Sequence, residues 1–311
     1  MDINSENIIK IDIILVLMIF QKGGIFMIIN TNDIKSSCRT MLINSMSSGE
    51  AGPAVPEPPA DWVRPASWPE LQTPAKNQIV FLISDAKRYT SGQFKTRILF
   101  NDTTTYDETT EKKICTIDWG DGTTTDVNVL PEMSSSSDIY RGGTDRNTYY
   151  VSHTYDELTG IDLSDRKCWP VTITMSTSIY VTNYKFLGID SSTNYDMSTL
   201  ELKMGTSIRF NTSSDLAIGL NSHSLLQSVE INNFCKSDTF RYCTSLQNVK
   251  LSTVLGKMSL PPSTFYECTS LRKFCSNSIT KLEDYCFYNC KSLEYIEWQP
   301  LKTPFCKNTI R

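Results

Sequence analysis

Short apolar runs separated by clusters of small polar residues follow one another through the middle of the chain. Residues 79–83 are continuously apolar, whereas residues 113–117 and 171–175 are alternating or rich in β-branched side chains. Runs of this length, bounded by Asn, Asp, Gly and Ser, indicate strands rather than helices. We therefore expect residues 78–182 to form antiparallel sheets, and the chain as a whole to be mainly β.

The pattern changes after residue 200, where a longer unit recurs. Phe240 begins the pattern Phe-x-x-Cys-x-Ser-Leu, which returns at Phe265 and Phe287, so that its cysteine recurs after 25 and then 22 residues. A weaker copy begins at Leu220 and has His223 in the place of the cysteine. A period of roughly 20–25 residues with a fixed leucine predicts a short leucine-rich-repeat solenoid, in which each coil stacks on the previous one.

This repeat resembles the BspA-type leucine-rich repeat over about residues 200–311. Equivalent residues of stacked coils lie above one another, so the phenylalanines should form one interior column and the cysteines the next. We interpret His223 as a substitute at the cysteine position rather than a functional group. The column residues are Phe240, Cys243, Phe265, Cys268, Phe287 and Cys290.

The chain contains ten cysteines, which raises the question of disulfides or zinc. No Cys-x-x-Cys pair occurs, and this argues against the common zinc and redox motifs. We expect buried thiols, because a thiol packs as a small apolar group in a narrow coil. A disulfide between Cys243 and Cys268 is the alternative, since neighbouring coils are about 5 Å apart.

A compact motif lies among the expected strands, and it resembles the PKD family over residues 78–182. The resemblance implies an immunoglobulin-like β-sandwich that acts as a spacer or binding module. The two glycines of its Trp-Gly-Asp-Gly turn allow positive φ angles beside an aspartate that can accept backbone N–H groups. Its tryptophan can fill the core, and its tyrosine hydroxyl is expected to tie back a loop. The motif residues are Trp119, Gly120, Asp121, Gly122, His153 and Tyr155.

A metal or acid–base site made of Asp118, Asp121 and His153 is the functional alternative for this motif. The chain has only two histidines, and no nucleophile elbow, phosphate loop or metal-spaced histidine pair occurs in it. We therefore expect no enzyme activity, no cofactor and no metal site. A net charge of −4, with no run of more than two basic residues, gives no reason to expect a nucleic-acid partner.

Seven of the 13 prolines fall within residues 47–74, which predicts an extended linker over residues 47–77. Trp62 and Trp68 lie in this linker and are expected to dock on a neighbouring surface. The sequence Asp-Trp-Val-Arg-Pro at residues 61–65 also resembles a segment that precedes sandwich domains in some tailed-phage structural proteins.

Residues 1–46 form an N-terminal segment. Its uninterrupted apolar run, residues 13–20, is far shorter than the roughly 20 residues that span a bilayer. Its acidic beginning does not fit a signal peptide. Residues 22–24 read Lys-Gly-Gly, which a bacterial ribosome-binding sequence can encode, so we hypothesise that translation starts at Met27 and that residues 1–26 are not translated.

The remaining boundaries place the sandwich at residues 78–182, a junction at 183–199 and the solenoid at 200–311. A solenoid presents alternate strand residues on one open sheet face, where partners bind. The outward positions of the coils carry mixed polar groups that favour hydrogen bonding over a charge field. These candidate ligand-binding residues are Gln227, Glu230, Gln247, Lys250, Arg272, Glu294 and Glu297.

Three functions compete at this point. The first is a non-catalytic recognition or adhesion protein that binds a glycan or protein on a host or neighbouring surface, displayed on a bacterial cell or a phage virion. The second is a structural assembly subunit of a phage tail or virion, favoured by the Trp/Pro-rich linker and the lack of a convincing export signal. The third is an ancillary binding region of an enzyme. No membrane span is expected under any of them.

Overall fold

Strands dominate every part of the chain that the structure describes. The computed structural model describes residues 19–21, 24–28, 59–85, 93–102, 113–128, 138–142, 148–176, 184–189, 197–210, 219–235, 237–251, 258–276 and 278–298. These residues include no α-helix, and therefore no helix that could cross a membrane; the short 3₁₀ turn η2 (Glu157–Thr159) is present. The prediction of a mainly β fold is confirmed.

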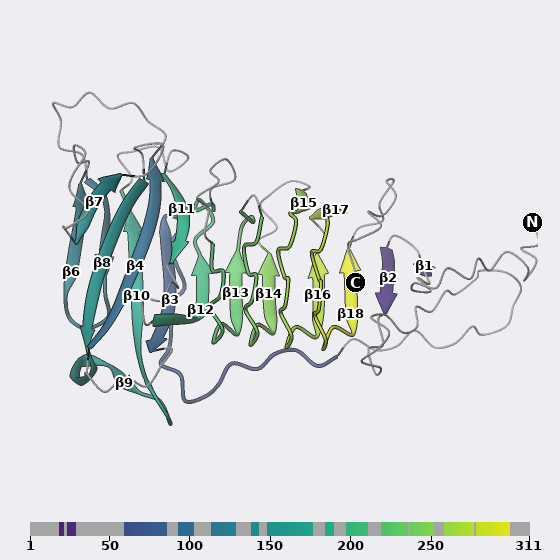
Figure 1. Ribbon diagram of the computed structural model, residues 1–311, viewed down its shortest axis with the longest axis horizontal. Helices are drawn as coiled ribbons and strands as arrows, with labels where there is room; N and C mark the ends of the chain where they lie inside the picture. Colours follow the sequence, from purple (N-terminus) through teal and green to yellow (C-terminus); the bar gives the residue numbers. More distant parts are fainter. Residues whose placement is uncertain are drawn as a thin grey trace, which may run out of the picture.

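Two sheets pack face to face at one end of the molecule (Figure 1). The first sheet contains, in spatial order, β14 (Asn248–Leu251), β13 (Ser228–Ile231), β12 (Met197–Met204), β3 (Gln78–Asp85), β10 (Lys167–Met175), β5 (Lys113–Asp118) and β6 (Thr124–Asn128), with β9 (Ile161–Asp162) beside β10. The second contains β11 (Tyr184–Ile189), β4 (Gln93–Asp102), β8 (Thr148–Asp156) and β7 (Ile139–Gly142). Apart from the β12–β13 and β13–β14 pairs, their neighbouring strands are antiparallel.

Large buried side chains fill the space between these sheets. Phe81 of β3 and Phe100 of β4 belong to this core together with Trp119 and Trp169. Strand β3 is buried on both faces, because Leu82 and its neighbours on the opposite side belong to a second apolar cluster. Burial on both faces explains why residues 79–83 are continuously apolar instead of alternating.

Strand β12 joins the sandwich to the rest of the molecule. One edge of β12 pairs antiparallel with β3, and Leu202 lies opposite Phe81. The other edge pairs parallel with β13, and the same Leu202 lies opposite Val229. The first sheet therefore continues from the sandwich into the coils. Residues 183–199, which we expected to form only a junction, contribute β11 to the second sheet and the beginning of β12 to the first.

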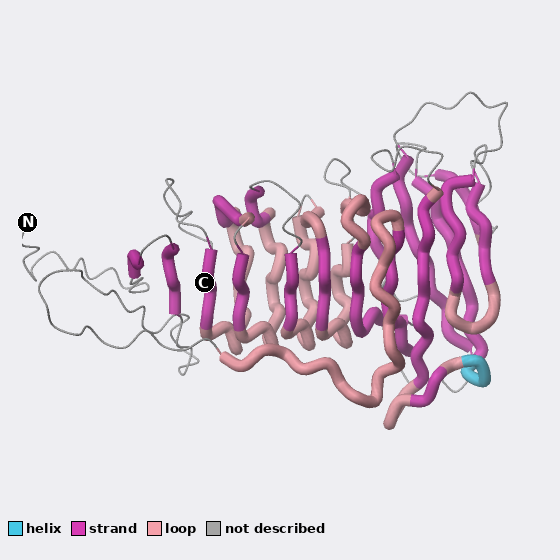
Figure 2. The backbone as a smooth tube through the Cα atoms, turned by 180° about the vertical axis from the view of Figure 1, so that it is seen from behind, coloured by secondary structure: helices cyan, strands magenta, loops and turns pink. Residues whose placement is uncertain are grey.

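Beyond β12 the chain winds into coils whose strands lie side by side (Figures 1 and 2). Strand β14 follows β13, and further along β16 (Lys273–Ser276) pairs parallel with β18 (Tyr295–Trp298). A small parallel pair, β15 (Met258–Leu260) and β17 (Ile279–Leu282), lies outside this row. The outer edge of β18 pairs antiparallel with β2 (Gly24–Ile28), which forms a hairpin with β1 (Ile19–Gln21). Met27, at which we placed the start of translation, lies within β2.

The predicted phenylalanine column is confirmed by the ring geometry. Phe240 stacks on Phe265 at 5.7 Å between ring centroids, and Phe265 stacks on Phe287 at 5.4 Å. The interplanar angles are 12° and 16°. All three side chains are buried, so the column forms a continuous aromatic interior along the coils.

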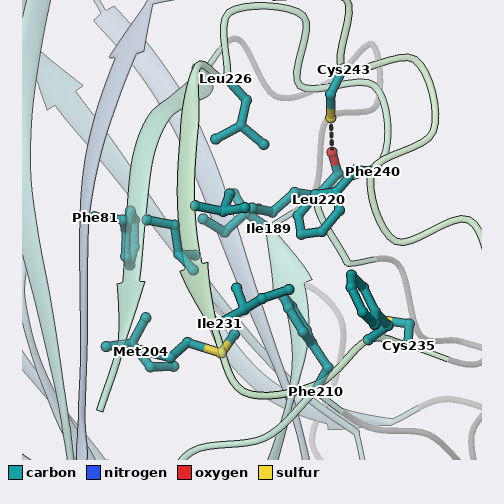
Figure 3. Packing of buried hydrophobic residues seen from close by; sticks show 14 of the residues in the cluster. Phe81, Ile189, Met204, Phe210, Leu220, Leu226, Ile231, Cys235, Phe240 and Cys243 are labelled. Carbon is teal, nitrogen blue, oxygen red and sulfur yellow. Dashed lines mark hydrogen bonds between the residues drawn. The ribbon is translucent and has the colours of Figure 1, made fainter. Parts of the chain in front are cut away.

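The cysteine column carries a second regular interaction. The thiol of Cys268 donates to the Phe240 carbonyl at 3.1 Å, and the thiol of Cys290 donates to the Phe265 carbonyl at 3.0 Å. Cys243 makes the corresponding bond to Leu220 at 2.9 Å, drawn as a dashed line in Figure 3. Burial raises the pKa of these three thiols, so each keeps the proton that it donates.

The disulfide that we considered between Cys243 and Cys268 is absent, and all eight cysteines in the described part of the chain are thiols. Cys38 and Cys306 lie outside the described residues. Both interior columns are therefore packing features.

His223 occupies the first position of the cysteine column and connects the first coil to both sheets. Its Nδ1 accepts the backbone N–H of Thr199 in β12 at 2.9 Å, which leaves Nε2 to donate to the carbonyl of Ile189 in β11 at 3.0 Å. The side chain is fully buried. The interpretation of His223 as a substitute for cysteine is confirmed, because it makes the same bond to the preceding layer as the thiols make.

Residues 59–77 form an extended strap that runs along one end of the row of strands from β16 back to β3 (Figure 1). Trp68 and Leu71 of the strap pack against Val80 and Leu82 of β3. Nearer the coils, the Arg64 guanidinium contacts the buried Glu201 carboxylate of β12 at 2.7 Å and donates to the carbonyls of residues 68 and 69. The expectation that the linker tryptophans dock on a surface holds for Trp68, and the surface belongs to the same chain.

We predict that Arg64→Ala lowers the free energy of unfolding by about 2 kcal/mol, because the buried Glu201 carboxylate loses its closest cation and keeps its 3.3 Å contact with Lys203. Urea denaturation followed by tryptophan fluorescence measures the change. Arg272→Ala is the matched control, since its pair with Glu294 is half exposed and should contribute about 0–1 kcal/mol. Equal effects of the two substitutions would show that the pair of Arg64 with Glu201 stabilises the fold no more than an exposed ion pair does.

Candidate binding face of the solenoid

The outward side chains of the coils form two rows, because the parallel register places equivalent residues next to each other. One row contains Glu230 of β13 and Lys250 of β14, which lie opposite each other and form an ion pair at 3.2 Å. Glu297 of β18 lies opposite Cys275 of β16. The register therefore places Glu230 beside Lys250 in one strand pair and Glu297 in a separate pair, β16–β18. Their role in ligand binding stays a prediction.

The second row lies immediately before the strands. Gln227 precedes β13, Gln247 precedes β14, and Arg272 precedes β16. The Arg272 guanidinium binds both carboxylate oxygens of Glu294 at 3.2 Å, which neutralises both charges and fixes the orientation of the guanidinium. Among the described side chains, the charges of Glu230, Lys250, Arg272 and Glu294 are thus paired.

The strap crosses this second row and forms with it a half-open cavity of about 290 Å³. Asp61 and Trp62 line the cavity from the strap side, and Gln227, Gln247 and Lys273 line it from the coils. The Lys273 ammonium forms an ion pair with the Asp61 carboxylate, which attaches the strap to β16. The candidate face is therefore part open sheet and part covered groove.

The contribution of the strap to this site was missed by the sequence analysis. Asp61, Trp62 and Lys273 were not among the candidate residues, although the Trp/Pro-rich composition had indicated docking. Composition predicts that such a segment is extended, but it does not indicate which surface the segment covers.

The Trp-Gly-Asp-Gly motif forms a closed structural turn. One oxygen of Asp121 accepts the backbone N–H of Thr123 at 2.9 Å and its hydroxyl at 2.6 Å, and the other lies 2.8 Å from His153 Nε2. The His153 ring stacks on Trp119 at 4.5 Å. Asp118 accepts the N–H of Gly120, whose φ of 75° and contact with Pro170 exclude a side chain. Each polar group thus has a structural partner.

No group of three His, Cys, Asp or Glu side chains in the described residues is arranged to hold a metal ion. The hydroxyl of Tyr155 departs from our expectation, since it is buried without a hydrogen-bond partner and ties no loop. Its ring instead packs against Trp169 and the edge of His153. Burial raises the pKa of Tyr155 well above its usual value, so the hydroxyl stays neutral.

Comparison with known families supports the repeat assignment. Residues 220–303 match the family model described as the BspA type leucine-rich repeat region, in six copies. We had identified three clear copies and a weaker one within this range. The comparison gave no support for a PKD domain in residues 78–182. No curated protein and no solved structure matched the chain.

We predict that Asp121→Asn destabilises the protein by about 1–2 kcal/mol at pH 7, through weakened hydrogen bonds in the turn. Burial alone would raise the pKa of Asp121, but the bonds from Thr123 and His153 outweigh it and hold this pKa below its ordinary value. The stabilisation is therefore present above the unfolded pKa of about 3.9 and is lost as the pH falls through the folded value.

Urea titrations at neutral and acidic pH test this prediction, and the deficit of Asp121→Asn should shrink in acid. Asp162→Asn serves as the control, because the Asp162 carboxylate is exposed and pairs only with Lys167 among the described contacts. A deficit that stays constant down to pH 2 would show that the carboxylate charge contributes nothing.

Proposed function

We propose that the protein is a non-catalytic recognition protein that binds a glycan or protein on a host or neighbouring surface. Repeats of the BspA type are typical of bacterial surface proteins and suggest surface binding. The observation that carries the proposal is the row of polar side chains on the outer face of the coils, which the parallel register holds at a fixed spacing. Such a preorganised array binds broad partners without a large ordering cost.

The sandwich supports this role by presenting the coils. We propose that it is a PKD-like, immunoglobulin-like module that acts as a rigid base, on the grounds of its two packed sheets and its Trp-Gly-Asp-Gly turn. Its sheet is continuous with the coils, so a force or a rotation applied to the sandwich is transmitted to the binding face.

A structural subunit of a phage tail or virion is the second candidate. The Trp/Pro-rich linker was one of its two supports, as a segment that docks into a larger particle, beside the lack of a convincing export signal. Trp68 and Leu71 pack on the core of their own chain instead. This intramolecular docking removes that support and favours the recognition role. An ancillary region of an enzyme has no specific observation in its favour.

The proposal predicts that Lys250→Ala on the outer face weakens binding to bacterial or host-cell surfaces by about tenfold, as expected for a central interface residue. Lys281→Ala is the matched control, because Lys281 of β17 also pairs with a glutamate, Glu283, but belongs to the small sheet outside the row. Fluorescently labelled protein titrated onto whole cells, and onto glycan and protein arrays, gives the affinities.

Equal affinity of the two lysine variants would show that the outer face is not the binding surface. Absence of binding to any cell, glycan or protein, combined with self-assembly in size-exclusion chromatography, would contradict the recognition function and favour the assembly subunit.

A further inference from the structure

The cavity between the strap and the coils has the form of a built site. Its strap wall is held at both ends, by the ion pair of Asp61 with Lys273 and by the contact of Arg64 with the buried Glu201. Its volume of about 290 Å³ is at the lower end of the range for small-molecule pockets, roughly 300–1,000 Å³. These two contacts hold the strap wall against the coils.

The charges around the cavity cancel in pairs. Asp61 is paired with Lys273, and Arg272 is paired with Glu294 through two contacts. Both pairs are largely exposed, so each contributes little by itself, but together they leave no uncompensated charge among these four groups to attract a charged ligand. The cavity is therefore suited to a neutral ligand.

The neutral polar groups of the cavity are available for such a ligand. Within the described residues, the side-chain amides of Gln227 and Gln247 make no hydrogen bond, although both line the cavity. Each amide offers a donor pair and an acceptor. Two such groups on successive coils match a ligand that carries several hydroxyl groups close together.

An aromatic ring completes the lining. Trp62 lies on the strap side of the cavity, and its ring is fixed by packing against Trp68 at 6.2 Å between centroids. A flat indole presents an apolar face with a polar edge, which suits the C–H face of a pyranose ring. A peptide backbone has no comparable flat apolar face.

We infer that this cavity is a subsite for one neutral sugar unit, held by the Gln227 and Gln247 amides against Trp62. The inference rests on the proposed recognition function and narrows its ligand to a neutral glycan. Cys275 provides an independent reporter, because its exposed thiol lines the same cavity while the other seven described cysteines are buried.

The test titrates the full-length protein with glucose, galactose, mannose and N-acetylglucosamine, followed by saturation-transfer NMR. At least one of these should bind, and Gln247→Ala should weaken it about fivefold or more, as expected for the loss of a hydrogen bond. Gln72→Ala is the matched control, since Gln72 is an exposed glutamine of the same strap that bonds Thr172 away from the cavity. N-acetylneuraminate, which carries a charge, should not bind.

Alkylation of Cys275, measured by peptide mass spectrometry, locates the site, and the sugar that binds should slow it. Binding of neutral sugars without protection of Cys275, equal binding by Gln247→Ala, or preferential binding of N-acetylneuraminate or peptides would overturn the subsite. Cell binding that depends on Lys250 but shows no response to any of the sugars would also overturn it, and would leave the recognition function intact. Loss of both kinds of binding would reject both.

Discussion

The structure depends on the pairing of β12 along both of its edges. A solenoid of few coils exposes the edge of its first strand and the open end of its core, and both must be covered. Here β3 covers the edge of β12, and β11 covers the end of the interior through the contact between Ile189 and His223. Figure 3 shows the result, with Phe81, Ile189, Leu220 and Phe240 in one uninterrupted core. The sandwich is thereby the cap that the coils require.

The interior columns extend the order of this cap along the coils to the candidate face. Aromatic stacking and the bonds from thiol to carbonyl repeat from coil to coil, so each layer fixes the position of the next. The spacing of the outer residues Gln227, Gln247 and Arg272 is set by the strands that directly follow them. The strap adds a wall at the same end of the strands. Under the proposed recognition function, a ligand would meet groups that are already in place, which reduces the entropic cost of binding.

The repeat could be predicted because each coil uses the same local residues for the same contacts. Phe240 and Cys243 signal their interior positions by recurring. The position of β12 could not be predicted in this way, because it depends on two partners without a local pattern. One is β3, about 120 residues earlier in the chain, and the other is β13, which follows β12 after a loop. The path of the strap depends on contacts such as Arg64 with Glu201, which have no local pattern. Tyr242 and Glu267, which precede the column cysteines, have positive φ angles. This conformation could not be predicted either, because glycine is the residue that usually signals it.

Hydrogen exchange of the full-length protein across a urea series, resolved by mass spectrometry, tests the dependence of the coils on the sandwich most directly. The amides of β10 report the sandwich, and those of β13 and β14 report the first coils. Our account predicts that β13 and β14 lose protection at the same urea concentration as β10 or at a lower one. Coils that stay protected after β10 exchanges freely would show that they fold without their cap, and would contradict the account.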